Sequence, residues 1–258
     1  MPRIQVVPLL EVVRETPSTM TYRFRADLGG KPGQFLMVWI PRFDELPMAV
    51  SYFGAVKGIT VRDYGDATHV LAAFNASDRI GVRGPYGNAF TLQGESVLAV
   101  AGGSGMASMI AAIEAFAQQG ARVVTAVGAK TAEELLFVNR ANGAGEVHIA
   151  TDDGSRGFHG FAPALAEKLL DREKVSQIIT CGPEKMMYAV VDLARRRSIP
   201  VQASLERYMK CGIGICDACA LDDQLVCYDG PIFTGDQLAG SQDFGQFRRD
   251  KSGRRIPV

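Results

Sequence analysis

The chain has 258 residues, of which 47% are hydrophobic, enough for one large domain or for two to three small domains with cores of their own. Its 28 basic residues balance its 28 acidic residues, which argues against a protein that binds nucleic acid or a membrane surface. No apolar run approaches the roughly 18–20 residues that span a bilayer, and residues 1–10 lack the layout of a signal peptide. We therefore expect a soluble cytoplasmic protein.

Residues 1–93 have the pattern of an antiparallel β-domain. Short runs rich in β-branched and aromatic residues are separated by Gly, Pro and Asp. The expected strands are 4–13, 20–26, 34–40, 50–53, 59–62 and 69–74. Many short strands with turn signals between them favour a small antiparallel barrel.

Residues 94–203 change to an alternation of strands and helices. Apolar runs at 96–101, 122–127, 146–150 and 177–180 predict buried strands, whereas 106–119 and 184–197 have helical spacing. This alternation predicts βαβ units and a Rossmann-like parallel sheet.

Residues 204–258 form the third predicted domain, a small one that holds four of the five cysteines. It ends in a basic tail, which we expect to be a solvated and partly disordered end. Docking on an acidic surface is the alternative. The basic residues of the tail are Arg248, Arg249, Lys251, Arg254 and Arg255.

The clustered cysteines follow the order Cys211-x4-Cys216-x2-Cys219-x7-Cys227. Disulfides explain such clustering poorly in a chain without an export signal, and this spacing is the plant-type [2Fe–2S] pattern. Glycines inside the loop let backbone amides approach the cluster sulfurs closely. A structural zinc site is the alternative, but zinc ribbons generally use two CxxC knuckles, and only one is present here.

A glycine turn follows the first strand of the predicted parallel sheet, at Gly102, Gly103, Ser104 and Gly105. Such a turn brings backbone N–H groups and a helix N-terminus against a pyrophosphate, although a purely structural turn is an alternative. Two further loops follow strands of the same sheet, where ligands of open sheets bind. These loops contain Thr151 and Asp152, and Cys181, Gly182 and Pro183.

The cysteine of the second loop, Cys181, is expected beside a nicotinamide ring, and the alternative is a buried small hydrophobe. A lysine after the second strand, Lys130, is a candidate for contacting the 2′-phosphate of NADP. A single lysine is more often a solvated charge. We find no acid, base or nucleophile that needs a catalytic role, because hydride transfer between stacked rings mainly requires orientation.

A flavin is expected in the barrel for a chemical reason. Nicotinamide delivers a hydride, a [2Fe–2S] centre accepts one electron, and a flavin can do both. The candidate binding positions are a strand segment, a glycine turn ending in a hydroxyl, and the segment that closes the barrel. These positions are Met48, Ala49, Val50, Ser51, Gly65, Thr68, Gly84, Tyr86 and Gly87.

Together these residues resemble the ferredoxin–NADP reductase superfamily across almost the whole chain, and more closely the electron-transfer subunits of type B dihydroorotate dehydrogenase. The most specific stretches are 205–219 and 227–233. The resemblance implies FAD on the barrel, NAD at the second domain and a [2Fe–2S] cluster on the four cysteines. It also implies an FMN-containing catalytic subunit that oxidises dihydroorotate to orotate in pyrimidine biosynthesis, in a heterotetramer with two copies of each subunit. Electrons would run from dihydroorotate through FMN, the cluster and FAD to NAD⁺.

The sequence departs from this family at three places. Met48 stands where the family has the arginine of its flavin strand, so that Arg62, Arg79 or Arg83 would have to replace it, or FAD would bind weakly. Ser108 replaces a proline, and the stretch between Cys219 and Cys227 is short. Rival readings are the small subunit of a bifurcating NADH–ferredoxin:NADP oxidoreductase or of a sulfide dehydrogenase, a stand-alone NAD(P)H–acceptor reductase, and a non-enzymatic module that has lost its flavin.

Overall fold

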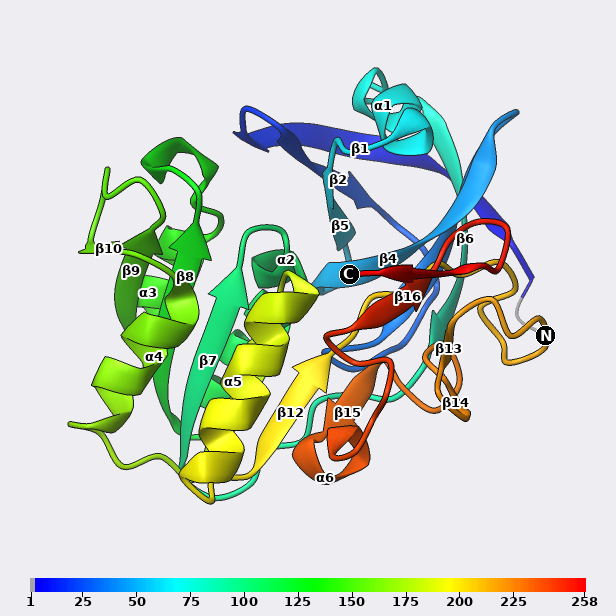
Figure 1. Cartoon of the computed structure of the whole chain (residues 1–258). Helices are drawn as coiled ribbons and strands as arrows, with labels where there is room; N and C mark the ends of the chain where they lie inside the picture. Colours follow the sequence, from blue (N-terminus) through cyan, green and yellow to red (C-terminus); the bar gives the residue numbers. More distant parts are fainter. Residues whose placement is uncertain (1–2) are drawn as a thin grey trace.

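The computed structural model describes residues 3–258, and Figure 1 shows their arrangement. A closed antiparallel barrel lies beside a seven-stranded sheet that is flanked by helices. The C-terminal segment packs between these two parts. The predicted fold class is confirmed.

The barrel has the strand order β1-β2-β5-β4-β3-β6, and the pairing of β1 with β6 closes it. Alternating residues point inward, so that Tyr22, Leu36, Ile59 and Val82 are fully withdrawn from water. The strands are β1 (Gln5–Thr16), β2 (Thr19–Phe24), β3 (Phe35–Ile40), β4 (Asp44–Phe53), β5 (Lys57–Arg62) and β6 (Arg79–Tyr86).

The strand expected at 69–74 is wrong. Helix α1 (Asp66–Ala72) and the turn after it occupy these residues. Leu71 is completely buried, and its carbonyl accepts a hydrogen bond from the hydroxyl of Tyr22 at 3.0 Å. A short apolar run does not distinguish a strand from a single buried helical face, which explains the error.

The parallel sheet has the order β10-β9-β8-β7-β11-β12-β15. All of its strands run parallel except β15, which pairs antiparallel with β12. The four strands predicted in this region are confirmed, within one or two residues at their ends. The sheet contains β7 (Ser96–Gly102), β8 (Arg122–Ala129), β9 (Glu146–Thr151), β10 (Phe158–His159), β11 (Gln177–Cys181), β12 (Val201–Ser204) and β15 (Ile232–Thr234).

Helices cover both faces of this sheet, as right-handed βαβ connections require. In Figure 1, α4 (Ala162–Leu170) and α5 (Glu184–Arg196) lie in front of the sheet, and α2 (Gly105–Gln118) and α3 (Val138–Ala144) lie behind it. The two predicted helices correspond to α2 and α5. The sequence did not predict α3, α4 or the short 3-10 turn η1 (Ala132–Glu134).

The C-terminal segment contributes to both larger parts. It contains the β13–β14 hairpin (Ala220–Leu221 and Gln224–Leu225), β15, α6 (Gly235–Leu238) and a last hairpin of β16 (Phe247–Arg249) and β17 (Arg255–Pro257). The expectation of a disordered tail is therefore wrong. Arg255 pairs with Asp243 at 2.7 Å and covers the ring of Phe247, which explains why the basic tail is ordered.

One hydrophobic core runs through all three regions. It contains Met37 of the barrel, Leu98 of the sheet, and Leu205, Cys219 and Phe233 of the C-terminal segment. Because buried apolar surface is shared in this way, the cysteine loop is fixed relative to both neighbours. Within residues 3–258 no helix has the length and apolar character needed to cross a membrane.

Candidate functional site

The glycine turn and the Cys181 loop lie against each other at the carboxyl ends of β7 and β11. A Cβ atom added to Gly105 would lie 2.3 Å from the carbonyl oxygen of Cys181, and one added to Gly182 would lie 3.0 Å from Cα of Gly102. Glycine is therefore required on both sides of this contact. Gly103 has a φ of +52° and open space around its missing side chain. The structure thus brings 102–105 and 181–183 together, with room beside Gly103 for a ligand to approach the backbone.

The Thr151 loop lies at the same edge of the sheet but beyond β8. The hydroxyl of Thr151 is buried and hydrogen-bonded to the backbone of Arg156, as acceptor at 3.0 Å and donor at 2.9 Å. Asp152 is exposed. The threonine therefore shapes the loop, and only the aspartate is open to a ligand.

Cys181 is completely buried, and burial raises the pKa of its thiol to about 12, with the charge of Glu206 adding to the effect. Hydrogen bonds to Ser108 and Ser204 act in the opposite direction. The side chain of Glu206 is exposed, and desolvation by the surrounding protein raises the pKa of its carboxyl. Its charge acts on the thiol of Cys181, which indicates that the two side chains are near each other. The sequence analysis did not select Glu206, although the signature stretch 205–219 contains it.

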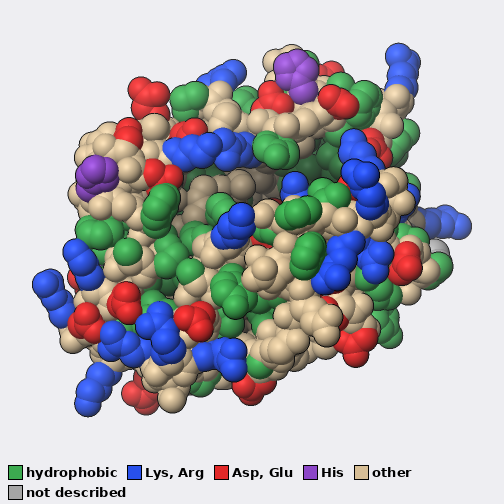
Figure 2. Space-filling view, viewed as in Figure 1, with side chains coloured by type: hydrophobic (Ala, Val, Ile, Leu, Met, Phe, Trp, Pro, Cys, Tyr) green, Lys and Arg blue, Asp and Glu red, His purple; other side chains and the backbone are tan. Residues whose placement is uncertain are grey.

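The face shown in Figure 2 is hollowed between the barrel and the carboxyl ends of the sheet, and Lys and Arg side chains lie around this hollow. A narrow crevice between the two parts joins Arg62 to the glycine turn at Gly103 and Ser104. Arg62 lies 3.9 Å from Glu134 across it. A cleft of this kind at the carboxyl ends of parallel strands is where open α/β sheets bind nucleotides.

The candidate flavin strand, β4, is largely covered. Met48 and Ala49 are half-buried and Val50 belongs to the barrel core. The buried hydroxyl of Ser51 hydrogen-bonds to the hydroxyl of Thr60 at 2.8 Å and to the carbonyl of Gly58 at 3.2 Å. Ser51 therefore already has hydrogen-bond partners within the protein.

Two arginines that the sequence analysis did not select lie beside β4. The guanidinium groups of Arg23 and Arg140 stack on the ring of Tyr52, each 3.9 Å from its centroid. Arg140 also donates to the carbonyl of Ser51 at 3.0 Å and pairs with Glu114 at 2.7 Å. Because these residues are distant in sequence, no local pattern could have indicated this arrangement.

The turn before α1 contains Gly65 and Thr68. The hydroxyl of Thr68 accepts hydrogen bonds from the amides of Tyr64 and Gly65, both at 2.9 Å, and donates to the carbonyl of Gly65 at 2.8 Å. The hydroxyl thus forms the helix cap. No atom approaches the open side of Gly65 within 4 Å.

The last candidate flavin segment, at the end of β6, packs on the C-terminal segment. Gly84 and Gly87 have φ of +129° and +73°, and a Cβ added to Gly87 would lie 2.4 Å from Cδ of Pro231. The ring of Tyr86 lies 5.9 Å from that of Phe35. This segment therefore connects the barrel to the residues that follow the fourth cysteine.

Of the three arginines proposed to replace the missing one at Met48, only Arg62 lies at the crevice. Arg79 donates to the carbonyl of Val6 at 3.2 Å. Arg83 forms a bidentate pair with Glu45, at 2.6 and 2.7 Å. Arg83 is thus bound within the protein.

The four clustered cysteines lie on a loop whose amides point at their sulfurs. The amides of Ile213 and Ile215 lie 3.4 and 3.3 Å from Sγ of Cys211, and that of Gly214 lies 3.2 Å from Sγ of Cys227. Burial acts to raise the pKa of Cys211, but hydrogen bonds from the amides of Ile213 and Ile215 and from Cys216 outweigh it, and the pKa falls to about 6. A thiolate is the form that binds metal, so the loop fits the donor set of an iron–sulfur cluster.

Cys219 and Cys227 are neighbours, because Sγ of Cys219 accepts a hydrogen bond from the amide of Cys227 at 3.4 Å. Backbone amides thus point at the sulfurs of Cys211, Cys219 and Cys227. Within residues 3–258, no three His, Cys, Asp or Glu side chains are grouped as ligands of a single ion. Amides directed at thiolate sulfurs suit an iron–sulfur cluster, and the plant-type spacing of the four cysteines favours [2Fe–2S] over structural zinc.

The cysteine loop lies between the barrel and solvent. A Cβ added to Gly212 would lie 2.7 Å from Cγ of Met37 on β3, which places the loop directly on the barrel wall. On its outer side, Ile215 and Tyr228 are 70% and 71% exposed. Two large apolar side chains are thus presented to solvent beside the cysteines.

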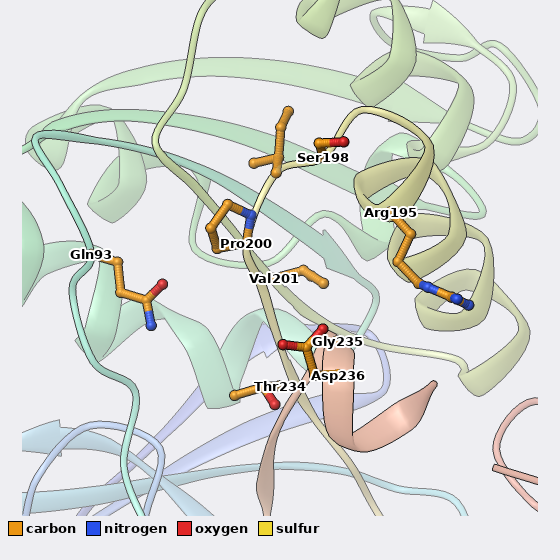
Figure 3. Close-up of a pocket in the computed structure, with 9 residues that line it drawn as sticks. Gln93, Arg195, Ser198, Pro200, Val201, Thr234, Gly235 and Asp236 are labelled. Atoms are coloured by element: carbon orange, nitrogen blue, oxygen red, sulfur yellow. The ribbon is translucent and has the colours of Figure 1, made fainter. Parts of the chain in front are cut away.

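A cavity of about 530 Å³ lies elsewhere, at the end of β12 opposite the Cys181 edge (Figure 3). None of the residues singled out in the sequence lines it. Its lining comes from the segment before β7, the end of α5 and the loop after it, the start of β12 and the β15–α6 turn, and consists of Gln93, Arg195, Ser198, Ile199, Pro200, Val201, Thr234, Gly235 and Asp236.

A closed barrel is followed by a parallel sheet, and the glycine turn and the Cys181 loop lie at the carboxyl ends of that sheet, beside the barrel. This arrangement defines a reductase of the ferredoxin–NADP reductase fold. Comparison with solved structures agrees. An NADH-dependent reduced ferredoxin–NADP oxidoreductase aligns with a TM-score of 0.83 and 25% identity, over 92% of this chain and 91% of that chain. The ferredoxin reductase of carbazole 1,9a-dioxygenase aligns with a TM-score of 0.69 and 17% identity, over 78% of this chain and 68% of that chain, which supports the fold alone.

Sequence comparison defines the family. Residues 206–239 match the iron–sulfur cluster binding domain of dihydroorotate dehydrogenase B. The probable electron transfer subunit of NAD⁺-linked dihydroorotate dehydrogenase B from Methanocaldococcus jannaschii is 47% identical over 95% of both chains. Its counterpart from Methanothermobacter thermautotrophicus is 43% identical over 98% of this chain and 97% of that protein. The chain belongs to the family of dihydroorotate dehydrogenase B electron transfer subunits.

Proposed function

We propose that this protein is the electron-transfer subunit of a dihydroorotate dehydrogenase and links NAD(H), FAD and a [2Fe–2S] cluster. The observation that carries the proposal is the segment that holds Cys211, Cys216, Cys219 and Cys227, in which backbone amides are directed at the sulfurs of three of these cysteines. In this proposal residues 1–93 bind FAD, 94–203 bind NAD and 204–258 hold the cluster.

The nucleotide would bind at the carboxyl ends of β7, β9 and β11. Gly102–Gly105 provide a backbone surface for the pyrophosphate at the start of α2, where the helix dipole favours negative charge. Gly182 and Pro183 lie at the end of β11 with Pro183 exposed, and Asp152 is open to a ribose hydroxyl. Glu206 would border the ring of the nicotinamide, and the completely buried thiol of Cys181 would lie behind that surface as a neutral group.

The flavin would lie between the barrel and this edge. Its candidate contacts are the half-buried residues Met48 and Ala49 with the adjoining Val50 and Ser51, the turn at Gly65 and Thr68, and the segment Gly84, Tyr86 and Gly87. When bound, FAD exchanges a hydride with nicotinamide and single electrons with the cluster. The protein's part is to orient the two rings and to exclude water, because hydride transfer depends on alignment.

The family implies a catalytic partner, which we propose to be an FMN-containing subunit in a heterotetramer with two copies of each chain. The exposed side chains of Ile215 and Tyr228 beside the cysteines suit a partner interface, since aromatic and aliphatic groups are enriched at interface cores. Docking there would bring the partner's cofactor close to the cluster.

The partner proposal is tested by capture of the tagged chain from its native lysate, followed by an assay of dihydroorotate-dependent NAD⁺ reduction. We expect an FMN-containing partner and this activity. Ile215→Asp and Tyr228→Ala should each weaken capture, whereas Tyr64→Ala, at an even more exposed aromatic in the turn before α1, should not. Capture without the activity would contradict the proposal.

A second candidate function is supported by the TM-score of 0.83 with an NADH-dependent reduced ferredoxin–NADP oxidoreductase. In that case the captured partner would be a large flavoprotein, and the complex would reduce NADP⁺ from reduced ferredoxin and NADH. The same capture experiment separates the two candidates.

A further inference from the structure

Arg83 connects the barrel to the cysteine loop through a single guanidinium group. It lies on β6 and forms a bidentate ion pair with Glu45 on β4, at 2.6 and 2.7 Å. The same group donates to the hydroxyl of Tyr86 at 3.0 Å and to the carbonyl of Cys211 at 2.9 Å. These are four hydrogen bonds to three partners, more than the three donors of a lysine can form, whereas the planar guanidinium has five.

This arrangement is partly withdrawn from water. The side chains of Arg83 and Glu45 are 14% and 24% exposed, so that their charges are less screened than at an open surface. Their pair is neutral as a whole. The cation is the nearer of the two charges to the cysteine loop, because Arg83 touches Cys211 directly.

We propose that Arg83 is a positioning residue for electron transfer, which clamps the Cys211 loop onto the barrel and, together with Glu45, sets the reduction potential of the cluster held by that loop. The inference rests on the proposed cluster. Reduction adds a negative charge to the cluster, so a nearby cation favours it and a nearby anion opposes it. Net charge and hydrogen bonding are the levers by which a protein tunes such potentials.

Neutralising Arg83 and neutralising Glu45 should shift the reduction potential of the cluster in opposite directions. Arg83→Gln leaves the Glu45 carboxylate unpaired and should lower the reduction potential, and Glu45→Gln leaves the guanidinium unpaired and should raise it. The double variant should return towards the wild-type value. We expect about a tenfold change in the reduction equilibrium constant for Arg83→Gln, about 59 mV for a one-electron couple, and a smaller change for Glu45→Gln.

The positioning prediction uses Arg83→Lys, which keeps the charge but loses the planar fork. Its potential should stay near the wild-type value, while its cluster should be lost several-fold faster in the presence of an iron chelator. Arg79→Gln is the matched control, because Arg79 lies on the same strand but contacts only the carbonyl of Val6 among hydrogen-bond partners in residues 3–258. Arg79→Gln should change neither the reduction potential nor the rate at which the cluster is lost.

The experiment is a redox titration of the cluster in the purified full chain, followed by electron paramagnetic resonance, with iron content and melting temperature measured for every variant. A shift of the same sign in Arg83→Gln and Glu45→Gln, or no shift in either, would overturn the inference. If Arg83→Gln fails to fold, an unchanged potential in Glu45→Gln is still sufficient to overturn it. A wild-type protein without iron or signal would instead contradict the proposed function.

Discussion

Arg207 and Glu184 form an ion pair that is almost completely removed from solvent, with side-chain exposures of 2% and 8%. Glu184 begins α5 directly after the Cys181 loop, and Arg207 precedes the cysteine loop. The amide of Gly245, next to the C-terminal hairpin, donates to the same carboxylate at 2.8 Å. One buried pair therefore fastens the nucleotide edge, the cysteine loop and the C-terminal segment together.

Removing one partner of this pair should destabilise the protein strongly. Arg207→Met leaves a buried carboxylate without its cation, and such losses cost about 3–5 kcal/mol. The free energy of unfolding from urea titration of the wild type and the variant measures the effect. Arg196→Gln is the control, since its pair with Asp192 is 58% and 55% exposed and should contribute less than about 1 kcal/mol. Equal losses in the two variants would show that the buried pair has no special role.

Gly212→Ala should damage the cysteine loop. Its φ of +68° costs an L-residue about 1–2 kcal/mol, and the new Cβ would press on Met37 at 2.7 Å. We expect lower iron content as well as lower stability. Gly253→Ala is matched in backbone conformation, with a φ of +85°, but has open space around its Cβ. That variant should lose stability through backbone strain alone and keep its iron, and a similar loss of iron in both would contradict the packing argument.

Tyr22→Phe should change how stability depends on alkaline pH. Burial raises the pKa of Tyr22 to about 12 in the folded protein, above the ordinary value of 10.0. Between pH 10 and pH 12 the Tyr22 hydroxyl loses its proton in the unfolded chain and keeps it in the folded chain. The contribution of Tyr22 to the free energy of unfolding is therefore complete below pH 10 and is lost as the pH rises towards 12.

At neutral pH the phenylalanine variant loses the hydrogen bond to Leu71, which costs about 1 kcal/mol. Its unfolding free energy should then fall less steeply than that of the wild type above pH 10. Urea titrations across pH 8–11 measure the two slopes. Parallel curves over this range would refute the assignment of the alkaline loss to Tyr22.

The sequence predicted most of the fold because its signals are local. Each buried strand of the parallel sheet, such as the one before Gly102, is a continuous apolar run ended by glycine, and barrel strands alternate between inward and outward residues. Residues 69–74 were misassigned because the burial of Leu71 depends on the barrel end above it. The ordered tail was missed because Asp243, which neutralises Arg255, lies outside the basic run.

The site was predictable in part for the same reason. Cysteine spacing and the glycine turn are local patterns, and the structure places both groups where ligands could reach them. Contacts between residues that are far apart in the sequence leave no such local pattern. Arg83 and Cys211 are joined only by folding, as are Tyr52 and Arg140, and Glu206 becomes notable only because its charge acts on Cys181.

The most direct test of the account is to reduce the purified chain anaerobically with NADH and record its electron paramagnetic resonance and flavin absorbance, in the wild type and in Cys216→Ala. The account predicts a reduced-cluster signal in the wild type. In Cys216→Ala the flavin absorbance should still bleach while the cluster signal is absent. An unchanged cluster signal in the variant would contradict the ligand assignment, and a wild-type protein whose flavin and cluster both fail to respond to NADH would contradict the proposed electron path.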